Sequence, residues 1–299
     1  MRNSKTLAMF IISAISMFGN FAFAKDPSPL VISFQKQKNP EEIQKTAEIV
    51  AAYLKEKIGI AVEVLVPTSY GVTAQAMINN KVHVAYMDSL PFILASAEAK
   101  LEILAVEKRN GRTNYDSVIV VPQSSLVKNL ADLKGKRFSF TSQTSTSGYL
   151  FPVANLIEEK LIKNSSEVNS YFSQINYAGG YDKALLSVVN GQADAAAMSD
   201  YVIEGKKADI YGSAEVRNQV RILKRFSGVP THLIAANGSL SKELITKIKK
   251  ALMSLSTDKP ELLSSVYGAA ELVEANESHI QTTQKALIKT GFEVKKFVK

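Results

Sequence analysis

The sequence predicts an α/β protein of two lobes, each a mixed, mainly parallel sheet flanked by helices, with a ligand cleft between the lobes. Three observations lead to this fold class. The 299 residues are enough for two domains of ordinary size. Short apolar runs alternate with segments of helical spacing along most of the chain. A segment of the first half also recurs 111 positions later, where Tyr70 falls on Tyr181.

The first half opens with strands and helices in strict alternation. In order, strand, helix, strand, helix and strand are expected at residues 30–34, 40–57, 60–66, 74–80 and 82–86. Such an order implies parallel pairing through crossover helices, and ligands bind beyond the carboxyl ends of parallel strands. Tyr70 and Asp88 are therefore expected in loops at the binding edge.

The second half repeats the alternation after a strand at 117–121. The elements that follow are a strand, a helix, a strand, a helix and a strand, at residues 137–140, 149–161, 173–177, 182–190 and 193–197. The hydroxyl-rich loop 141–148 joins the first two of them. The loop therefore leads from a strand end into a helix N-terminus.

The repeat is a gapless match between the two halves. The coinciding pairs are Tyr70 with Tyr181, Asn79 with Asn190, and Met87 with Met198. The next two residues are Asp88-Ser89 in the first half and Ser199-Asp200 in the second, so the acidic and hydroxyl residues exchange places. Two similar lobes facing each other explain this match, although two generic helix-turn-strand segments remain the alternative.

The last part of the chain is expected to return to the first lobe. Strands are expected at 220–223 and 233–236, and outer helices at 242–255, 260–266 and 277–289. The predicted boundaries are 28–118 plus 232–299 for lobe 1 and 119–231 for lobe 2.

The N-terminus has the pattern of a secretory signal peptide over residues 1–24. A positive start precedes the apolar stretch 7–18, and Ala22-Phe23-Ala24 fits a cleavage site. An uncleaved anchor is less favoured, because a membrane span needs about 20 mostly apolar residues. No cysteine follows that could carry a lipid. We expect a soluble periplasmic protein that is not a lipoprotein.

The composition excludes several functions. With 0 Cys there is no disulfide, thiolate nucleophile or cysteine-bound metal. The formal charge of +8 is spread along the chain rather than gathered with aromatics, which argues against nucleic acid as a partner. His83, His232 and His279 lack metal-ligand spacing, and His83 fits a structural role inside a strand. The sequence predicts no metal, no cofactor and no catalytic residue.

The segment Ser145-Thr146-Ser147-Gly148 is the most informative for function. Hydroxyls and backbone N–H groups at a helix start bind oxyanions without a cationic side chain. A capping loop that binds only water is the competing interpretation. Nucleotide hydrolysis is not supported, because the segment lacks the Gly-Lys-Ser/Thr ending of a P-loop.

Six further side chains could line the same cleft. Tyr70, Tyr115 and Tyr181 are expected in polar loops, where a phenol can donate to an anion oxygen. Asp88, Asp200 and His232 are expected at strand ends or between strands, where they could contact a polar or cationic part of a ligand. An exported enzyme that uses these last three is the alternative from another class, although no nucleophile has recognisable spacing.

Over residues 30–235 the chain resembles the periplasmic phosphate/phosphite/phosphonate-binding proteins of ABC transporters. The segments that carry the resemblance are Thr68-Ser69-Tyr70-Gly71, Asn114-Tyr115-Asp116-Ser117, 130–137, 145–152 and 190–195. The resemblance implies the type II periplasmic binding protein fold, closing by hinge motion on an oxyanion held by Ser145 to Ser147, Tyr70 and Tyr115. It also implies an inner-membrane permease as partner, and we expect a monomer.

The chain departs from the family at three positions. Tyr181 replaces a common His, Asp88 stands where relatives tend to have Gly, and His232 lies near an acidic position of some aminophosphonate binders. A carboxylate beside a dianion is repulsive. The ligand is therefore expected to be a protonated oxyanion or a zwitterion. Two alternatives stay open: a ligand-sensing protein for a membrane sensor kinase, and the same fold with another small anionic or zwitterionic ligand.

Overall fold

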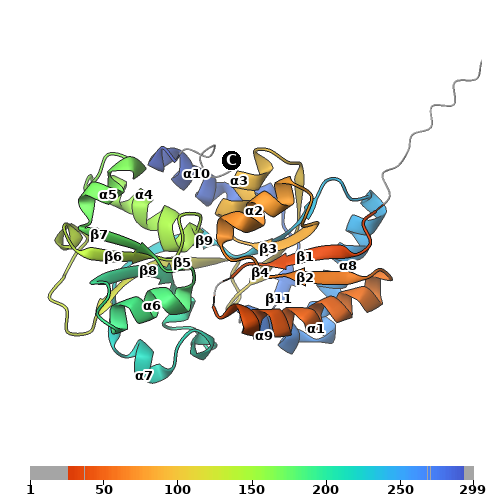
Figure 1. Ribbon diagram of the computed structural model, residues 1–299, viewed down its shortest axis with the longest axis horizontal. Coiled ribbons are helices and arrows are strands. Elements are labelled where there is room, and N and C mark those ends of the chain that lie inside the picture. Colours follow the sequence, from red (N-terminus) through yellow and green to blue (C-terminus); the bar gives the residue numbers. More distant parts are fainter. Residues whose placement is uncertain (1–25, 37, 268, 270, 293–299) are drawn as a thin grey trace, which may run out of the picture.

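The structure is a computed structural model that describes residues 26–36, 38–267, 269 and 271–292. Two sheets lie side by side, each covered by helices, and the chain passes between them near the middle of the molecule (Figure 1). The predicted two-lobed α/β architecture is confirmed. The predicted signal peptide, residues 1–24, lies outside the described residues. Within the described residues, no helix combines the length and apolar character needed to cross a membrane.

Lobe 1 is built on a six-stranded sheet of order β11-β4-β10-β3-β1-β2. Its strands are β1 (Leu30–Phe34), β2 (Val62–Leu65), β3 (Val84–Met87), β4 (Leu101–Lys108), β10 (Leu233–Asn237) and β11 (Glu271–Val273). Helices α1 (Pro40–Ile58), α8 (Lys242–Asp258) and α9 (Pro260–Tyr267) pack together on one face, and α2 (Tyr70–Ile78) and α3 (Ser89–Ser96) on the other (Figure 1). Leu30, Ile32 and Phe34 of β1 join the core beneath α1 and α8.

Lobe 2 is built on a five-stranded sheet of order β7-β6-β8-β5-β9. Its strands are β5 (Asn114–Pro122), β6 (Arg137–Phe140), β7 (Gln174–Tyr177), β8 (Ala195–Ser199) and β9 (Val220–Pro230). Its helices are α4 (Phe151–Glu158), α5 (Val168–Tyr171), α6 (Tyr181–Val189) and α7 (Ala214–Arg217). Short turns complete it: η1 (Ala131–Leu133), η2 (Thr146–Leu150), η3 (Ser165–Glu167), η4 (Asp200–Val202) and η5 (Ala208–Ile210).

Both sheets are mixed, but antiparallel pairing is more frequent than the sequence indicated. Among the described strands four pairings are parallel and five are antiparallel. Two strands that arrive from the other lobe cause this difference. β5 follows β4 and β10 follows β9 without an intervening helix, and each lies antiparallel to both of its neighbours in its sheet. The sequence also contained no indication of α3 and β4, because their apolar runs have neither a clear helical nor an alternating period.

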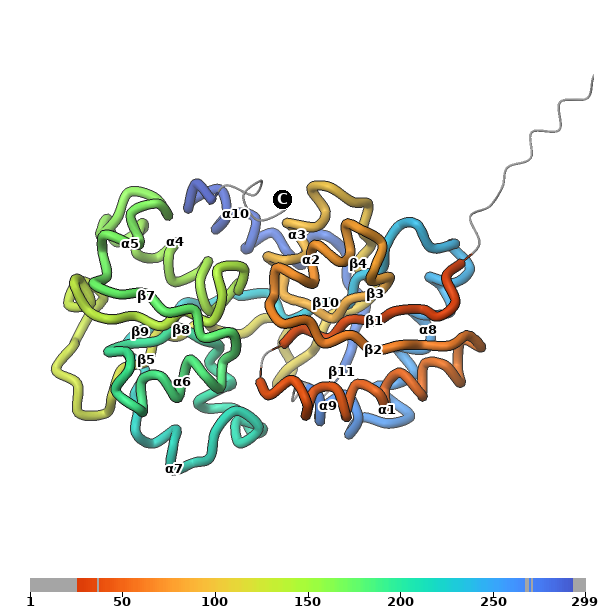
Figure 2. Tube along the Cα trace, viewed as in Figure 1, coloured from red at the N-terminus to blue at the C-terminus, as the bar shows by residue number. Residues whose placement is uncertain are grey.

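Three connections join the lobes. The first follows β4, the second is the two-residue step Thr231-His232 between β9 and β10, and the third leads from β11 through η6 (Glu277–Ile280) to α10 (Gln281–Thr290). Figure 2 shows α10 lying across the top of the molecule, above both lobes. It contacts α4 and β9 of lobe 2, although its residues fall in the predicted range of lobe 1.

The internal repeat is confirmed in three dimensions. Helices α2 and α6 are both nine residues long, begin at Tyr70 and Tyr181, and end before Asn79 and Asn190. Each leads into an inner strand of its sheet, β3 or β8. One detail of the sequence analysis is wrong: the two tyrosines are the first residues of helices, not loop residues, because the extended backbone of Ser69 and Gly180 starts each helix earlier.

Candidate functional site

The strand ends of lobe 2 bring four hydroxyl groups together. We call Tyr115, Ser147, Tyr181 and Ser199 the hydroxyl cluster. Ser147 Oγ lies 2.9 Å from Tyr181 Oη, 2.9 Å from Ser199 Oγ and 3.3 Å from Tyr115 Oη. None of the four side chains is more than 2% exposed. The cluster is therefore a dense set of neutral donors in a site that excludes water.

The segment 141–148, which we call the anion loop, is shaped by its own hydrogen bonds. The Gly148 N–H donates to Ser145 Oγ at 3.0 Å, so Ser145 caps the wide first turn of η2. The Ser117 hydroxyl donates to the Ser147 carbonyl at 2.7 Å. A Cβ at position 148 would lie 2.3 Å from Thr141 Oγ1, so only glycine fits there. The loop consequently presents its N–H groups in a fixed orientation at the start of a helix.

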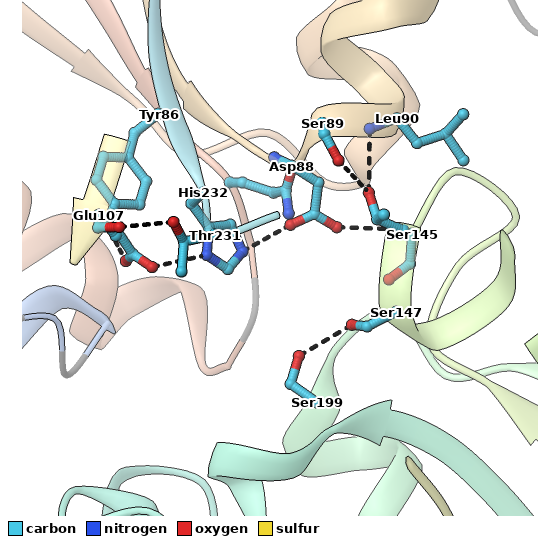
Figure 3. A network of polar contacts seen from close by, with 12 residues as sticks. Tyr86, Asp88, Ser89, Leu90, Glu107, Ser145, Ser147, Ser199, Thr231 and His232 are labelled. Atoms are coloured by element: carbon cyan, nitrogen blue, oxygen red, sulfur yellow. Dashed lines mark hydrogen bonds and ion pairs between the residues drawn. The ribbon is translucent and has the colours of Figure 1, made fainter. Parts of the chain in front are cut away.

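Lobe 1 contacts the anion loop directly, through the residues that follow β3. The Thr146 N–H donates to Asp88 Oδ2 at 3.2 Å, and the Leu90 N–H donates to Thr146 Oγ1 at 3.0 Å. Ser89 Oγ lies 3.4 Å from the same Thr146 hydroxyl. Figure 3 shows these residues reaching from the strand end toward the loop. The two lobes are thus in contact at the anion loop, with the carboxylate of Asp88 beside it.

Behind Asp88 lies a row of buried charged groups. His232 Nε2 is 2.6 Å from Asp88 Oδ1, and its Nδ1 is 3.1 Å from Glu107 Oε2. Arg109 Nη2 is 3.3 Å from Glu107, and Tyr86 Oη also bonds this carboxylate. Asp88 is 1% exposed and Arg109 7%, while Glu107 and His232 are fully buried. We call Asp88, His232, Glu107 and Arg109 the charged row.

The charges in the row fix one another's protonation. Burial lowers the pKa of His232, but the charges of Glu107 and Asp88 outweigh it and raise the pKa to about 9. Burial likewise raises the pKa of Glu107, and Arg109 and His232 outweigh it and bring the pKa down to about 2. In the hydroxyl cluster, burial and the charge of Asp88 raise the pKa of Tyr181 to about 12. The phenol therefore stays a neutral donor.

The structure brings most of the residues singled out from the sequence to this interface. Ser145, Thr146, Ser147, Tyr115, Tyr181, Asp88 and His232 belong to the anion loop, the hydroxyl cluster or the charged row. Tyr70 is fully buried, and the neighbouring Gly71 lies close to Thr144 of the anion loop. Tyr115 was expected in a loop but lies in β5, since that strand begins three residues earlier than the sequence indicated.

Asp200 is not brought to the hydroxyl cluster. Its carboxylate lies 3.4 Å from Arg225 Nη1, beside Asp116 and Glu204, which pair with the same guanidinium. These residues line a cavity of about 240 Å³ that also borders Tyr115. Asp200 therefore faces a neighbouring space that is rich in charges of both signs.

Three contributors were missed in the sequence. Ser199 is the reversed counterpart of Asp88 in the repeat, which is a signal that could have identified it. Glu107 and Arg109 lie at the end of β4 and just beyond it, and their partner His232 is more than a hundred residues away in the chain, so no local pattern indicates them. His83 has the expected structural role, because its Nδ1 accepts from the Val31 N–H at 2.9 Å. Among the described residues there is no cluster suited to hold a metal ion.

This geometry agrees with a match to a protein family. Residues 32–280 match the model of the family described as "ABC transporter, phosphonate, periplasmic substrate-binding protein". The chain belongs to this family. It is the substrate-binding protein of an ABC transporter, and members of this family work in the periplasm with an ABC permease. Binding proteins of this kind perform transport rather than catalysis, so the alternative of an exported enzyme is wrong.

Individual family members are distant in sequence and close in fold. The chain is 26% identical over 230 residues to the phosphate-import protein PhnD of Mycolicibacterium smegmatis, covering 75% of this chain and 70% of that protein. It is 25% identical over 206 residues to the phosphonates-binding periplasmic protein of Escherichia coli, covering 67% of this chain and 58% of that protein. The structure of PhnD1 from Prochlorococcus marinus in complex with methylphosphonate superposes with a TM-score of 0.73 at 15% identity, covering 88% and 98%.

Proposed function

We propose that this protein captures a small phosphorus oxyanion, a phosphonate, phosphite or phosphate, between its two lobes by hinge closure. The observation that carries the proposal is the hydroxyl cluster next to the anion loop, in which three buried hydroxyls lie within 3.3 Å of Ser147 Oγ. Hydrogen bonds to a charged acceptor are each stronger than bonds to a neutral one, by roughly a factor of two. Several such donors can therefore hold an oxyanion without a cationic side chain.

The proposed contacts divide between the lobes. Lobe 2 would supply Ser145, Thr146, Ser147, Tyr115 and Tyr181, and lobe 1 would supply Tyr70 and Asp88. His232 would hold Asp88 through their ion pair without contacting the ligand. Asp200 would face any ligand substituent that reaches the cavity beside Arg225. Because the donors and Asp88 come from different lobes, a ligand would contact all of them only in the closed form, so binding favours closure.

Asp88 supports a further restriction on the ligand. A carboxylate that already lies 3.2 Å from the Thr146 nitrogen repels a fully deprotonated oxyanion at the same donors. The proposed ligand is therefore an oxyanion that carries a proton, which it donates to Asp88, or a zwitterion whose cationic part faces Asp88. Asp88→Asn is expected to weaken this preference. The affinity for phosphite is measured by calorimetry over a range of pH. If Asp88→Asn has the same affinity as the wild-type protein at every pH, the restriction is contradicted.

The proposal also covers export, oligomeric state and the protein that receives the ligand. The pattern in residues 1–24 supports export through a cleaved signal peptide without lipid attachment. A monomer that delivers its ligand to an inner-membrane permease is the simplest arrangement. A sensing role, in which the closed form contacts a membrane sensor kinase, uses the same site and is separated from transport by uptake measurements in cells that lack the protein.

Thermal shifts of the chain from residue 25 test the proposal directly. The ligands are phosphate, phosphite, methylphosphonate and 2-aminoethylphosphonate, with sulfate and amino acids as controls. A ligand at about 100 times its dissociation constant stabilises the folded protein by about 2.7 kcal/mol. We expect stabilisation by at least one phosphorus oxyanion and none by amino acids. A flat response to every phosphorus compound would contradict the proposed function.

A further inference from the structure

The charged row connects the hinge to the ligand site. His232 lies in the two-residue connection between β9 and β10, and Glu107 is in β4 next to the first connection. The Thr231 hydroxyl donates to the Glu107 carbonyl at 2.6 Å, which joins both connections. Figure 3 shows Glu107, His232 and Asp88 in line, with Asp88 pointing toward the anion loop. Asp88 bonds that loop through the Thr146 N–H.

The positions of the two carboxylates determine the protonation state of the His232 ring between them. Each nitrogen of His232 faces a carboxylate oxygen, Nε2 at 2.6 Å and Nδ1 at 3.1 Å. A carboxylate can only accept a hydrogen bond, so the contact with Glu107 needs a proton on Nδ1. Two carboxylates at these distances favour the imidazolium, which forms an ion pair with Asp88. A neutral ring would turn a lone pair toward one of the carboxylates at a position that is buried from solvent. Two carboxylates and two cations then make the row neutral as a whole.

Aromatic packing holds the ring in place. The ring of Tyr86 stacks on one side at 6.0 Å between centroids and the ring of Tyr115 at 6.1 Å, tilted by only 13° and 5°. The ring therefore cannot turn away from its partners without disturbing both tyrosines. The titratable and charged groups that face His232 from the surrounding elements are Asp88, Glu107, Arg109, Tyr86, Tyr115, Tyr201 and His279.

Resting on the proposed capture of a phosphorus oxyanion, we propose that Glu107 and His232 are positioning residues that hold the Asp88 carboxylate directed at the anion loop, with the His232 imidazolium balancing its charge from behind. The imidazolium then keeps its proton when the ligand arrives. The proton that decides binding belongs to the ligand, and Asp88 accepts a hydrogen bond from it. Ligand selection consequently depends on the protonation of the oxyanion and not on that of the protein.

Glu107→Gln tests this role, because glutamine keeps the size and removes the charge. In the wild-type protein, affinity for phosphite is expected to fall by about tenfold per pH unit above the second pKa of phosphite, since one proton is taken up. In Glu107→Gln, His232 loses one of its two carboxylate partners, and its ring should then release a proton within the neutral pH range. The plot of phosphite affinity against pH should then show a second break for this variant. Above that break, binding should also return a proton to His232.

The matched control is Glu158→Gln, which removes an exposed ion pair with Lys289 of 2.7 Å. Its profile should equal that of the wild-type protein. Identical profiles for Glu107→Gln and the wild type would overturn the proposal. If no phosphorus oxyanion binds the wild-type protein at all, the proposed function fails instead, and the two failures are thus distinguishable.

A measurement on the unmodified, ligand-free protein keeps the proposal testable even if Glu107→Gln does not fold. Nitrogen-15 NMR of the histidine rings distinguishes a doubly protonated ring from either neutral tautomer. At pH 8 we expect both nitrogens of His232 to be protonated, while the rings of His83 and His279, whose pKa values burial lowers, are neutral. A neutral His232 ring at pH 8 would overturn the proposal whatever the ligand is.

Discussion

The two halves of the repeat end in the same two residue types in opposite order, and the order decides what each lobe offers a ligand. In lobe 1, Asp88 follows Met87 and its carboxylate faces the anion loop. In lobe 2, Ser199 follows Met198 and its hydroxyl joins the hydroxyl cluster. The aspartate of lobe 2 comes one residue later and lies beside Arg225 instead. Neighbouring residues at a strand end point in different directions, so exchanging them exchanges a carboxylate for a neutral hydroxyl in the cleft.

This difference gives the lobes separate tasks. The wall of lobe 2 is neutral and attracts an anion through hydroxyl and N–H donors. The wall of lobe 1 carries a buried carboxylate whose charge is balanced from behind by His232. We infer that attraction comes from lobe 2 and selection by protonation from lobe 1. Four experiments, described in order of decreasing expected effect, test this division of tasks.

Ser199→Asp makes lobe 2 resemble lobe 1 and should have the largest effect. The new carboxylate would lie next to Ser147 without a balancing cation, and an unpaired buried charge costs about 3–5 kcal/mol. We expect loss of oxyanion binding by more than about 100-fold, measured by calorimetry at neutral pH. Retained affinity in a folded variant would show that the lobe 2 wall need not be neutral.

Ser147→Ala removes the hydroxyl at the centre of the cluster. A hydrogen bond to a charged group contributes about 1.5–3 kcal/mol, so affinity should fall roughly 10- to 100-fold. Thermal unfolding of the ligand-free variant serves as the control for general damage. A change in affinity of less than about threefold, below the weakest such bond, would separate the cluster from ligand binding.

The pH dependence of stability should reveal the charged row. The pKa of His232 is raised to about 9 from 6.5, so its contribution to folding is fully present below pH 6.5 and is lost as the pH rises through 9. The melting temperature should accordingly decline over this window in the wild-type protein. Asp88→Asn leaves His232 with one carboxylate, and the decline should move to lower pH. If the two curves coincide, Asp88 and His232 are not coupled.

Asp200→Asn should have the smallest effect. Its carboxylate shares Arg225 with Asp116 and Glu204, so the guanidinium keeps two partners. We expect the affinity for phosphite to stay within about threefold of wild type, since a partly exposed ion pair contributes little. A loss as large as that of Ser147→Ala would place Asp200 in the ligand site, as the sequence suggested.

Local patterns in the sequence predicted the lobe 2 side of the site. The hydroxyl-rich segment around Ser147 and the repeated Tyr181 are visible in a few consecutive residues. The lobe 1 side depends on a buried ion pair between Glu107 and His232, which are 125 residues apart and come together only when β4 and β10 pair. A charged residue in an apolar strand carries no sign of its partner, which is why Glu107 and Arg109 were not anticipated. The contact of Asp200 with Arg225 was also not visible in the sequence, because the two residues come together only when β8 and β9 pair with β5.

Proton uptake on ligand binding tests the central claim most directly. The wild-type protein is titrated with phosphite by calorimetry at a pH one unit above the ligand's second pKa, in buffers of different ionisation enthalpy. We expect uptake of about one proton for each ligand bound, because the oxyanion that dominates above this pKa must take up a proton before it can donate a hydrogen bond to Asp88. Binding with no proton uptake would show that the fully deprotonated oxyanion is accepted beside Asp88, and it would contradict the account.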